Sequence, residues 1–254
     1  MQNDISINHL FFNYDGATVL EDINLQYNRT EFLAIIGPNG GGKSTLLKLI
    51  IGLLEPSLGE ILLFGKKPLH VSHEIAYVPQ DTIANKDFPI KVLDVVLMGR
   101  LSKSKFFAPY SKEDYTIAYE MLEKVGMKGF ENQKINTLSG GQRQRVFIAR
   151  ALACDAKIIF LDEPTASIDT AGQMSMFQLL KTLNENVGIV IISHDINVAL
   201  HYASKVAHVN KILYLHDLCD TQATETLKKT NSHFCPIELI HSRQCHHTHK
   251  ELLC

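Results

Sequence analysis

The chain has 254 residues, of which 45% are hydrophobic and 20% are charged, and its formal net charge at pH 7 is −2. This length allows one large domain with subdomains, and the absence of a basic stripe argues against nucleic acid as a main partner. No apolar run approaches the ~18 residues that a membrane-spanning helix needs. The start carries Asn3 and Asp4 where a secretory signal would be basic, so we expect a cytosolic chain.

The first strong pattern is a glycine-rich stretch between a strand and a helix. Residues 31–36 are typical of a short apolar strand, and residues 44–51 are typical of a buried helix that ends near Gly52. The stretch fits G-x-x-x-x-G-K-[S/T], in which backbone N–H groups close around phosphate oxygens, Lys43 reaches the β- and γ-phosphates, and Ser44 binds Mg²⁺. A turn that merely joins strand to helix would not need the Lys-Ser pair. The predicted phosphate-binding residues are Gly37, Pro38, Asn39, Gly40, Gly41, Gly42, Lys43, Ser44 and Thr45.

The segment that follows is predicted to contain a strand, a helix and a loop. Residues 75–80 form an apolar strand that ends in a glutamine. Residues 88–100 have the apolar spacing of a helix, whereas residues 102–110 are polar and aromatic and are typical of an exposed loop. We expect any partner surface of this region to lie around residues 80–91 and in that loop.

A second helix is predicted to begin at Ser111, with Asp114 as its capping-box partner, and to end before Gly126. Its apolar side chains recur at helical spacing, so they belong to a core. Two interpretations stay open for the helical segment as a whole. It either packs only on its own core or also offers a surface to a separate subunit.

The sequence Leu138-Ser-Gly-Gly-Gln142 is a second strong signal. Ser139 and Gln142 are spaced as a capping box, which predicts a helix through Leu152. An ordinary helix start explains the cap but does not explain Gly140 and Gly141, which leave backbone donors uncovered at the positive end of that helix.

Two carboxylates follow an apolar strand at residues 157–161. Asp162 and Glu163 stand at the carboxyl end of this strand, which is the end where open α/β sheets bind ligands. Beside a phosphate loop, Asp162 is expected to hold Mg²⁺ through water, and Glu163 is expected to polarise the attacking water. The alternative is an acidic turn closed by Pro164. A further apolar strand at 188–193 delivers His194 in the same way.

Histidine and cysteine gather in the last part of the chain, residues 219–254. Four of the five cysteines lie there, and in a cytosolic chain we expect them to be reduced. Cysteine and histidine suit Zn²⁺, but the spacing is irregular and contains no C-x-x-C pair. A disordered tail that binds metal adventitiously is the alternative to a structured site. The candidate ligands are His233, Cys235, Cys245, His246, His247 and His249.

In this order, the motifs resemble those of the ATP-binding cassette (ABC) ATPases over roughly residues 1–215. The resemblance implies an α/β fold: a RecA-like P-loop NTPase core with an antiparallel β subdomain and an inserted α-helical subdomain. Gly41 and the pair Ser167-Ile168 stand where alanine and Ala-Leu are common in that family. The implied domains are an ATPase domain at 1–218, with its helical part at about 81–137, and a tail at 219–254.

The resemblance also implies roles for single residues. Tyr14 is expected to stack on adenine, Gln80 to contact Mg²⁺ and sense the nucleotide, and His194 to contact the γ-phosphate. A homodimer is implied, in which each chain completes the ATP site of its twin. The residues expected to act in trans are Ser139, Gly140, Gly141, Gln142 and Asp169; Asp169 is also spaced as a helix N-cap.

Residues 87–100 are similar to the corresponding stretch in ATPases of zinc, manganese and iron uptake systems. We therefore expect an ATP-hydrolysing importer subunit at the cytoplasmic face of the inner membrane. Polytopic membrane permease subunits would be its direct partners and a substrate-binding protein an indirect one. A soluble ATPase of iron–sulfur cluster assembly, an importer ATPase for a non-metal substrate and a non-enzymatic metal-sensing module remain alternatives. A DNA-repair ATPase is disfavoured, because no long coiled-coil insertion separates Gln80 from Leu138.

Overall fold

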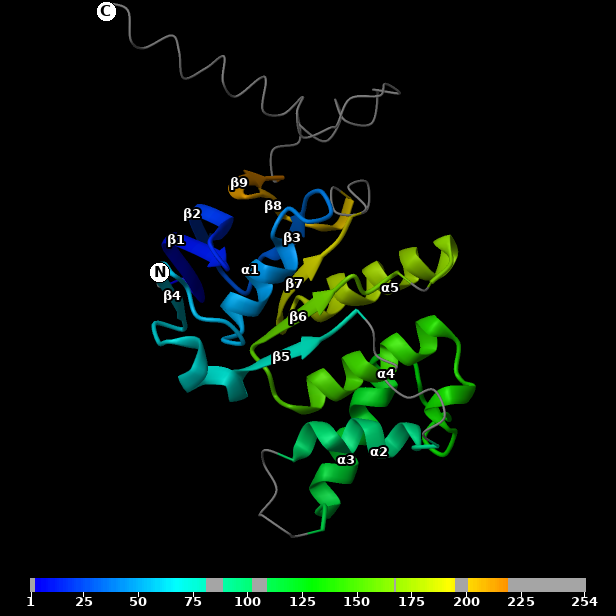
Figure 1. Ribbon diagram of the computed structural model, residues 1–254. Helices are drawn as coiled ribbons and strands as arrows, with labels where there is room; N and C mark the ends of the chain where they lie inside the picture. Colours follow the sequence, from blue (N-terminus) through cyan, green and yellow to red (C-terminus); the bar gives the residue numbers. More distant parts are fainter. Residues whose placement is uncertain (1–2, 81–88, 102–108, 167, 195–200, 219–254) are drawn as a thin grey trace, which may run out of the picture.

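The computed structural model describes residues 3–80, 89–101, 109–166, 168–194 and 201–218 (Figure 1). Short 3₁₀ turns lie at Pro68–Glu74, Met98–Arg100 and Ile135–Thr137. The strands are β1 (Ile5–Tyr14), β2 (Ala17–Tyr27), β3 (Phe32–Ile36), β4 (Leu58–Leu63), β5 (Ile75–Val78), β6 (Ile158–Asp162), β7 (Gly188–Ile192), β8 (Lys205–Asn210) and β9 (Ile212–Asp217). The helices are α1 (Lys43–Ile50), α2 (Val92–Leu97), α3 (Lys112–Lys124), α4 (Gly140–Ala153) and α5 (Thr170–Leu183).

A six-stranded sheet with the order β5-β6-β7-β3-β8-β9 forms the centre of the fold. Its strands run parallel except for β9, which pairs antiparallel with β8. Strands β3, β6 and β7 are buried along their whole length. Uninterrupted apolar runs of this kind are typical of parallel strands covered on both faces, and they place the carboxyl ends of these strands at one edge.

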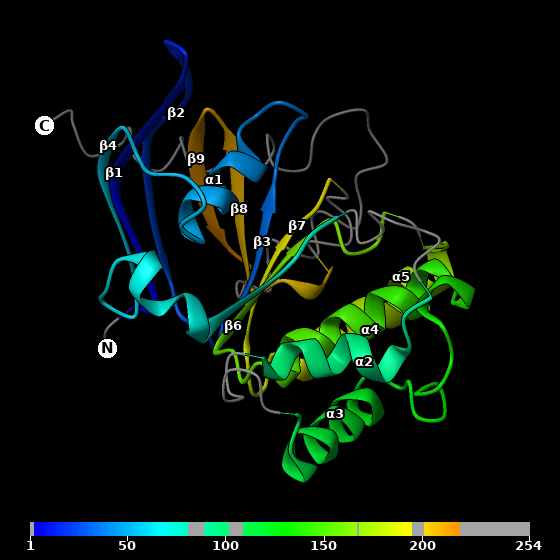
Figure 2. The same cartoon turned by 60° about the horizontal axis from the view of Figure 1, so that its bottom comes forward.

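One face of this sheet is covered by α1 and by a small antiparallel sheet with the order β2-β1-β4 (Figure 2). Alternate residues of the central strands, such as Leu33 and Ile35, face this side and pack with Leu46 and Ile50 of α1. This arrangement confirms the predicted α/β fold and its antiparallel β subdomain.

The opposite face is covered by α4 and α5, with α2 and α3 packed beyond them (Figure 2). A buried arginine ties these helices together. The Arg100 guanidinium donates to Asp114 Oδ1 over 3.0 Å and to the carbonyl oxygen of Ala153 over 2.9 Å. It therefore joins the end of α2, the start of α3 and the end of α4, and these helices pack as one unit.

The predicted helix starts agree with the structure at two positions and differ at a third. Both expected capping boxes are present, at Ser111 for α3 and at Ser139 for α4. The helix predicted over residues 88–100 is shorter, because α2 begins only at Val92. Lys91 before it is extended and pairs with Lys134 in an isolated bridge, and α2 ends at Leu97.

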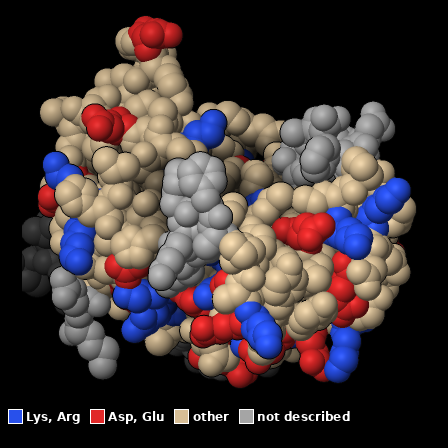
Figure 3. Space-filling view, turned by 90° about the horizontal axis from the view of Figure 1, so that it is seen from below, with Lys and Arg blue, Asp and Glu red and all other residues tan. Residues whose placement is uncertain are grey.

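None of the helices in the described ranges is long and apolar enough to cross a membrane. Figure 3 shows the molecule from below the view of Figure 1. Over this face the acidic and basic side chains are interspersed rather than separated into two patches. The α3 sequence has the same character, since it carries Lys112, Glu113, Glu120, Glu123 and Lys124 along its length.

Candidate nucleotide site

The glycine-rich loop connects β3 to α1 at the carboxyl edge of the central sheet (Figure 1). Gly42 is the N-cap of α1 and has φ of +100°, in the region that glycine adopts without strain. No described side chain caps this helix. The first N–H groups of a helix have no partner within the helix, so those of α1 are placed to receive an anion.

Lys43, the first residue of α1, is 6% exposed. Its ammonium group donates hydrogen bonds of 2.9 Å to the carbonyl oxygens of Gly37 and Pro38, so the side chain folds back over its own loop. Burial lowers the pKa of Lys43, and the carboxylates of Glu163 and Asp162 oppose that shift. The Lys43 ammonium group thus lies against its own loop, and the charges of Asp162 and Glu163, at the end of a different strand, favour its protonated form.

The turn between β8 and β9 braces the phosphate loop from outside. The Lys211 N–H donates to the Gly41 carbonyl oxygen over 3.1 Å, and the Lys211 carbonyl accepts from the Glu21 N–H over 2.8 Å. A Cβ at Gly37 would lie 2.0 Å from the Val209 carbonyl oxygen, and one at Gly41 would lie 2.8 Å from it. The close approach of the β8 backbone at Val209 therefore explains why both positions are glycine.

We predict that Gly37→Ala lowers nucleotide affinity by at least about tenfold and stability by roughly 1–3 kcal/mol, since the added methyl group must displace the backbone of β8. Gly129→Ala is the matched control: Gly129 also has positive φ, of +89°, but a Cβ there meets nothing within 4 Å. Titration with a fluorescent ATP analogue and thermal unfolding would measure both effects. Equal affinity in the two variants would contradict the bracing.

The two carboxylates predicted from the sequence stand at the end of β6. Asp162 is 8% exposed, and the Tyr77 hydroxyl donates to its Oδ2 over 3.4 Å. Burial, aided by the Glu163 charge, raises the pKa of Asp162. Glu163 has φ of +47°, which is uncommon for a residue with a side chain, and its N–H donates to the Ile192 carbonyl at the end of β7 over 3.0 Å. Backbone strain of this kind gathers at functional sites.

Glu163 also brings Gln80 and His194 together. Gln80, which follows β5, donates from Nε2 to Glu163 Oε2 over 2.8 Å. His194, which follows β7, has Nδ1 3.4 Å from the same oxygen. Three residues that are far apart in sequence thus meet because β5, β6 and β7 are neighbours in the sheet and end at one edge.

Tyr14 ends β1 in the small sheet and is 44% exposed. Its ring packs edge-on against Phe12, with ring centroids 4.7 Å apart. An exposed aromatic face is what base stacking requires.

The predicted trans-acting residues lie at the starts of α4 and α5. Ser139 and Gln142 form the reciprocal capping box of α4, and Asp169 caps α5 by accepting from the Gly172 N–H over 3.3 Å. Helices α4 and α5 pack on the face of the central sheet opposite to α1. Within the described residues, no hydrogen bond or ion pair joins these caps to Lys43 or Glu163.

The predicted Mg²⁺ ligands suit that ion. The Ser44 hydroxyl, the Asp162 carboxylate and the Gln80 side-chain oxygen are hard donors of the kind that Mg²⁺ prefers. Burial and then the Glu163 charge raise the pKa of Asp162, and a bound divalent cation would favour the ionised form of both carboxylates. In the described part of the chain, no group of three or more His, Cys, Asp or Glu side chains could hold a metal ion. The histidine- and cysteine-rich segment 219–254 lies outside the described residues, and metal binding there stays a prediction.

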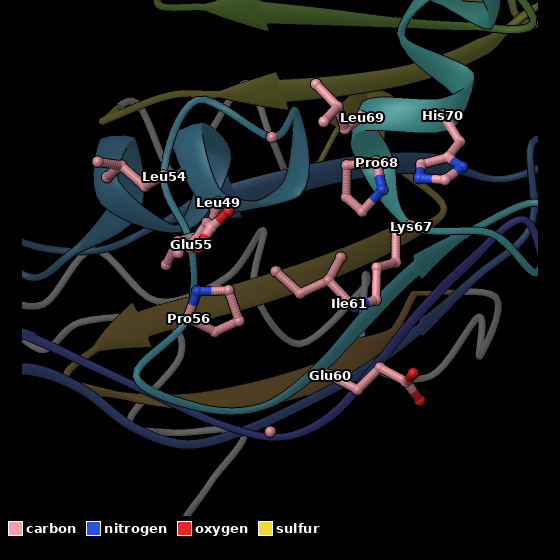
Figure 4. Close-up of a pocket in the computed structure, with 12 residues that line it drawn as sticks. Leu49, Leu54, Glu55, Pro56, Glu60, Ile61, Lys67, Pro68, Leu69 and His70 are labelled. Atoms are coloured by element: carbon pink, nitrogen blue, oxygen red, sulfur yellow. The ribbon is translucent and has the colours of Figure 1, made fainter.

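Sequence reasoning missed the residues that support the site from a distance. Val209, Lys211 and Tyr77 reach the site because the strands that carry or flank them lie beside it, and no local sequence pattern marks them. A separate hollow of about 490 Å³ lies near the far end of α1 (Figure 4). None of the predicted nucleotide-site residues lines it; its apolar lining includes Leu49, Leu54, Pro56, Ile61, Pro68 and Leu69.

Comparison with known proteins agrees with the family that the motifs resemble. Residues 20–166 match the profile of the ABC transporter family. The chain is 38% identical over 228 residues to the manganese transport system ATP-binding protein MntB of Halalkalibacterium halodurans, covering 89% of this chain and 91% of that protein. It is 40% identical over 207 residues to the zinc transport system ATP-binding protein TroB of Treponema pallidum, covering 81% of this chain and 78% of that protein.

A solved structure, a bacterial ABC transporter cassette in a dimeric state, superposes with a TM-score of 0.73 at 31% identity. The match covers 84% of this chain and 98% of that one.

Proposed function

The chain belongs to the ABC transporter family, and from this premise we propose that it is the ATPase subunit of an importer for a divalent transition metal. It works as a head-to-tail homodimer that holds two ATP molecules. It binds the cytoplasmic side of polytopic membrane permease subunits, which in turn receive cargo from a substrate-binding protein.

One observation carries the proposal. The phosphate loop, Asp162, Glu163, Gln80 and His194 share one edge of the sheet, while the capped start of α4 packs on the opposite face from α1. A single chain therefore offers a cradle and a candidate base on one side of the triphosphate. The N–H donors of Gly140 and Gly141, in the first turn of α4, have no partner within that helix and remain for a second chain to use. A solved relative that is dimeric supports this arrangement.

Each residue then has a role. Tyr14 stacks on adenine, residues 37–45 enclose the phosphates, and Lys43 neutralises charge on the β- and γ-oxygens. Ser44, Asp162 and Gln80 would hold Mg²⁺, which supplies positive charge at the phosphate oxygens when bound. The partner copy's capped α4 start, Ser139 to Gln142, and its Asp169 close the far side of the γ-phosphate.

Hydrolysis depends on Glu163 and His194. The Glu163 carboxylate accepts a proton from the attacking water. It follows Asp162 at the end of β6, and its charge acts on the Lys43 ammonium of the cradle. His194 donates toward the γ-phosphate and orients it. Before nucleotide enters, Gln80 and His194 both hold Glu163, so nucleotide binding and release of the base are linked. Closure of the dimer then moves the helical subdomain and the membrane subunits attached to it.

The metal cargo rests on the relatives rather than on the site. The catalytic residues serve any cargo equally, whereas the relatives at 38–40% identity are named for manganese and zinc transport. Iron–sulfur cluster assembly and import of a non-metal substrate are the competing functions. Co-purification with polytopic membrane subunits would separate a transporter from a soluble assembly ATPase.

The deciding experiment is uptake in a strain that lacks this gene. We expect accumulation of radioactive manganese or zinc to fall and to be restored by the wild-type chain but not by Glu163→Gln. Iron and a non-metal nutrient are measured in parallel. Normal uptake of all three metals together with a lost non-metal uptake would show that the cargo assignment is wrong.

A further inference from the structure

The side chain of Ile168 lies between two glycines that belong to different helices. A Cβ built at Gly141, in the first turn of α4, would lie 3.6 Å from Ile168 Cγ2 and 3.7 Å from its Cδ1. A Cβ built at Gly172, in the first turn of α5, would lie only 2.5 Å from Cγ2. Ile168 is therefore in direct reach of both helix starts, and Gly172 has no room for a side chain.

The backbone of Ile168 is held from both sides. Its N–H donates to the Thr165 carbonyl over 3.1 Å, and its carbonyl oxygen accepts from Gln173 Nε2 over 3.1 Å. Gln173 also donates to the Thr165 carbonyl over 3.4 Å. The side chain of an α5 residue thus fixes the turn that carries Ile168, and the next residue, Asp169, caps the same helix.

These contacts join two segments that the proposed function assigns to the same task. Gly141 lies in the segment that reaches across to the twin's γ-phosphate, and Asp169 lies in the other segment that crosses to the twin. Both segments sit at helix starts on one face of the sheet, and the side chain of Ile168 lies against both glycines.

We propose that Ile168 is a positioning residue that fixes the start of α4 relative to the start of α5, so that both reach the partner's nucleotide together. This inference rests on the proposed dimer. It assigns the packing of Ile168 to the trans half of the site, because the contacts of Ile168 described above are with the starts of α4 and α5 and not with the phosphate loop. Small displacements of positioned groups are costly, since a shift of about 1 Å can cost ~100-fold in rate.

The test separates pairing from nucleotide binding within one chain. In a Glu163→Gln background, we would measure ATP-dependent dimerisation by analytical ultracentrifugation and ATP affinity of the dilute monomer by fluorescence. Ile168→Ala is expected to weaken pairing by about 10- to 100-fold and to leave monomer affinity within about twofold. Ile168→Leu, which keeps the volume, is expected to restore pairing.

Ile117→Ala is the matched control, because Ile117 is also partly buried against the same core but lies on α3. Pairing of Ile168→Ala that equals pairing of Ile117→Ala would overturn the inference, as would an equal fall of pairing and monomer affinity. Should the parent Glu163→Gln chain never pair, the proposed dimer itself fails, a result distinct from a defect confined to Ile168→Ala.

Discussion

Replacing Glu163 with glutamine is expected to lower the rate of ATP hydrolysis by roughly 10²- to 10⁴-fold, the usual contribution of a general base. The amide cannot accept the proton from water, yet it keeps the size and the hydrogen-bonding shape of the carboxylate. ATP should therefore still bind, and the closed dimer should persist because hydrolysis no longer opens it.

Steady-state phosphate release and size-exclusion chromatography with and without ATP would measure both effects. Glu185→Gln removes the same charge from an exposed residue that lies just before β7, at the opposite end of the strand from the site. That control should hydrolyse ATP at the wild-type rate. Normal hydrolysis by Glu163→Gln would mean that another group activates water.

Lys43→Ala is expected to weaken ATP binding by about 10- to 100-fold. Hydrogen bonds to charged groups contribute roughly 1.5–3 kcal/mol, and each 1.4 kcal/mol changes affinity about tenfold. The Lys43 ammonium already lies against the loop, where it meets the carbonyl oxygens of Gly37 and Pro38. Alanine removes the cation that would meet the β- and γ-phosphates.

Isothermal titration with ATP and Mg²⁺ would measure the loss, with Lys181→Ala on α5 as the control for removal of one positive charge. The double variant Lys43→Ala, Glu163→Gln should also fail to form the ATP-dependent dimer, because pairing requires a loaded cradle. Unchanged ATP affinity in Lys43→Ala would count against the assignment of the phosphate loop.

The two predictions differ in what they disturb. One carboxylate oxygen of Glu163 lies against both Gln80 and His194. Replacement of Glu163 therefore perturbs a cluster formed at the ends of β5, β6 and β7. Lys43 belongs to one continuous strand-loop-helix unit. A variant of Lys43 should therefore act on binding, whereas a variant of Glu163 should act on hydrolysis.

The sequence alone determined the features whose physics is local. The sequence predicted the capping boxes at Ser111 and Ser139, the glycine loop and its helix, the apolar strand that ends in Asp162 and the apolar strand that precedes His194. Each of these features depends on contacts within a few residues or on the burial pattern of one element. Local contacts and burial patterns can both be recognised in a short stretch of sequence. The late start of α2, at Val92, was missed because pairing between Lys91 and Lys134 is not a local signal.

Only the tertiary structure decided how these pieces meet. The strand order places Gln80 and His194 beside Glu163, the backbone of β8 at Val209 leaves room only for glycine at positions 37 and 41, and Ile168 lies against the starts of α4 and α5. Such contacts arise from the packing of segments that are distant along the chain. The local patterns of a single sequence do not show which of these segments will be neighbours. The strand order and the helices that cover the two faces of the central sheet decide these neighbours, because together they bury the apolar surface of the whole fold.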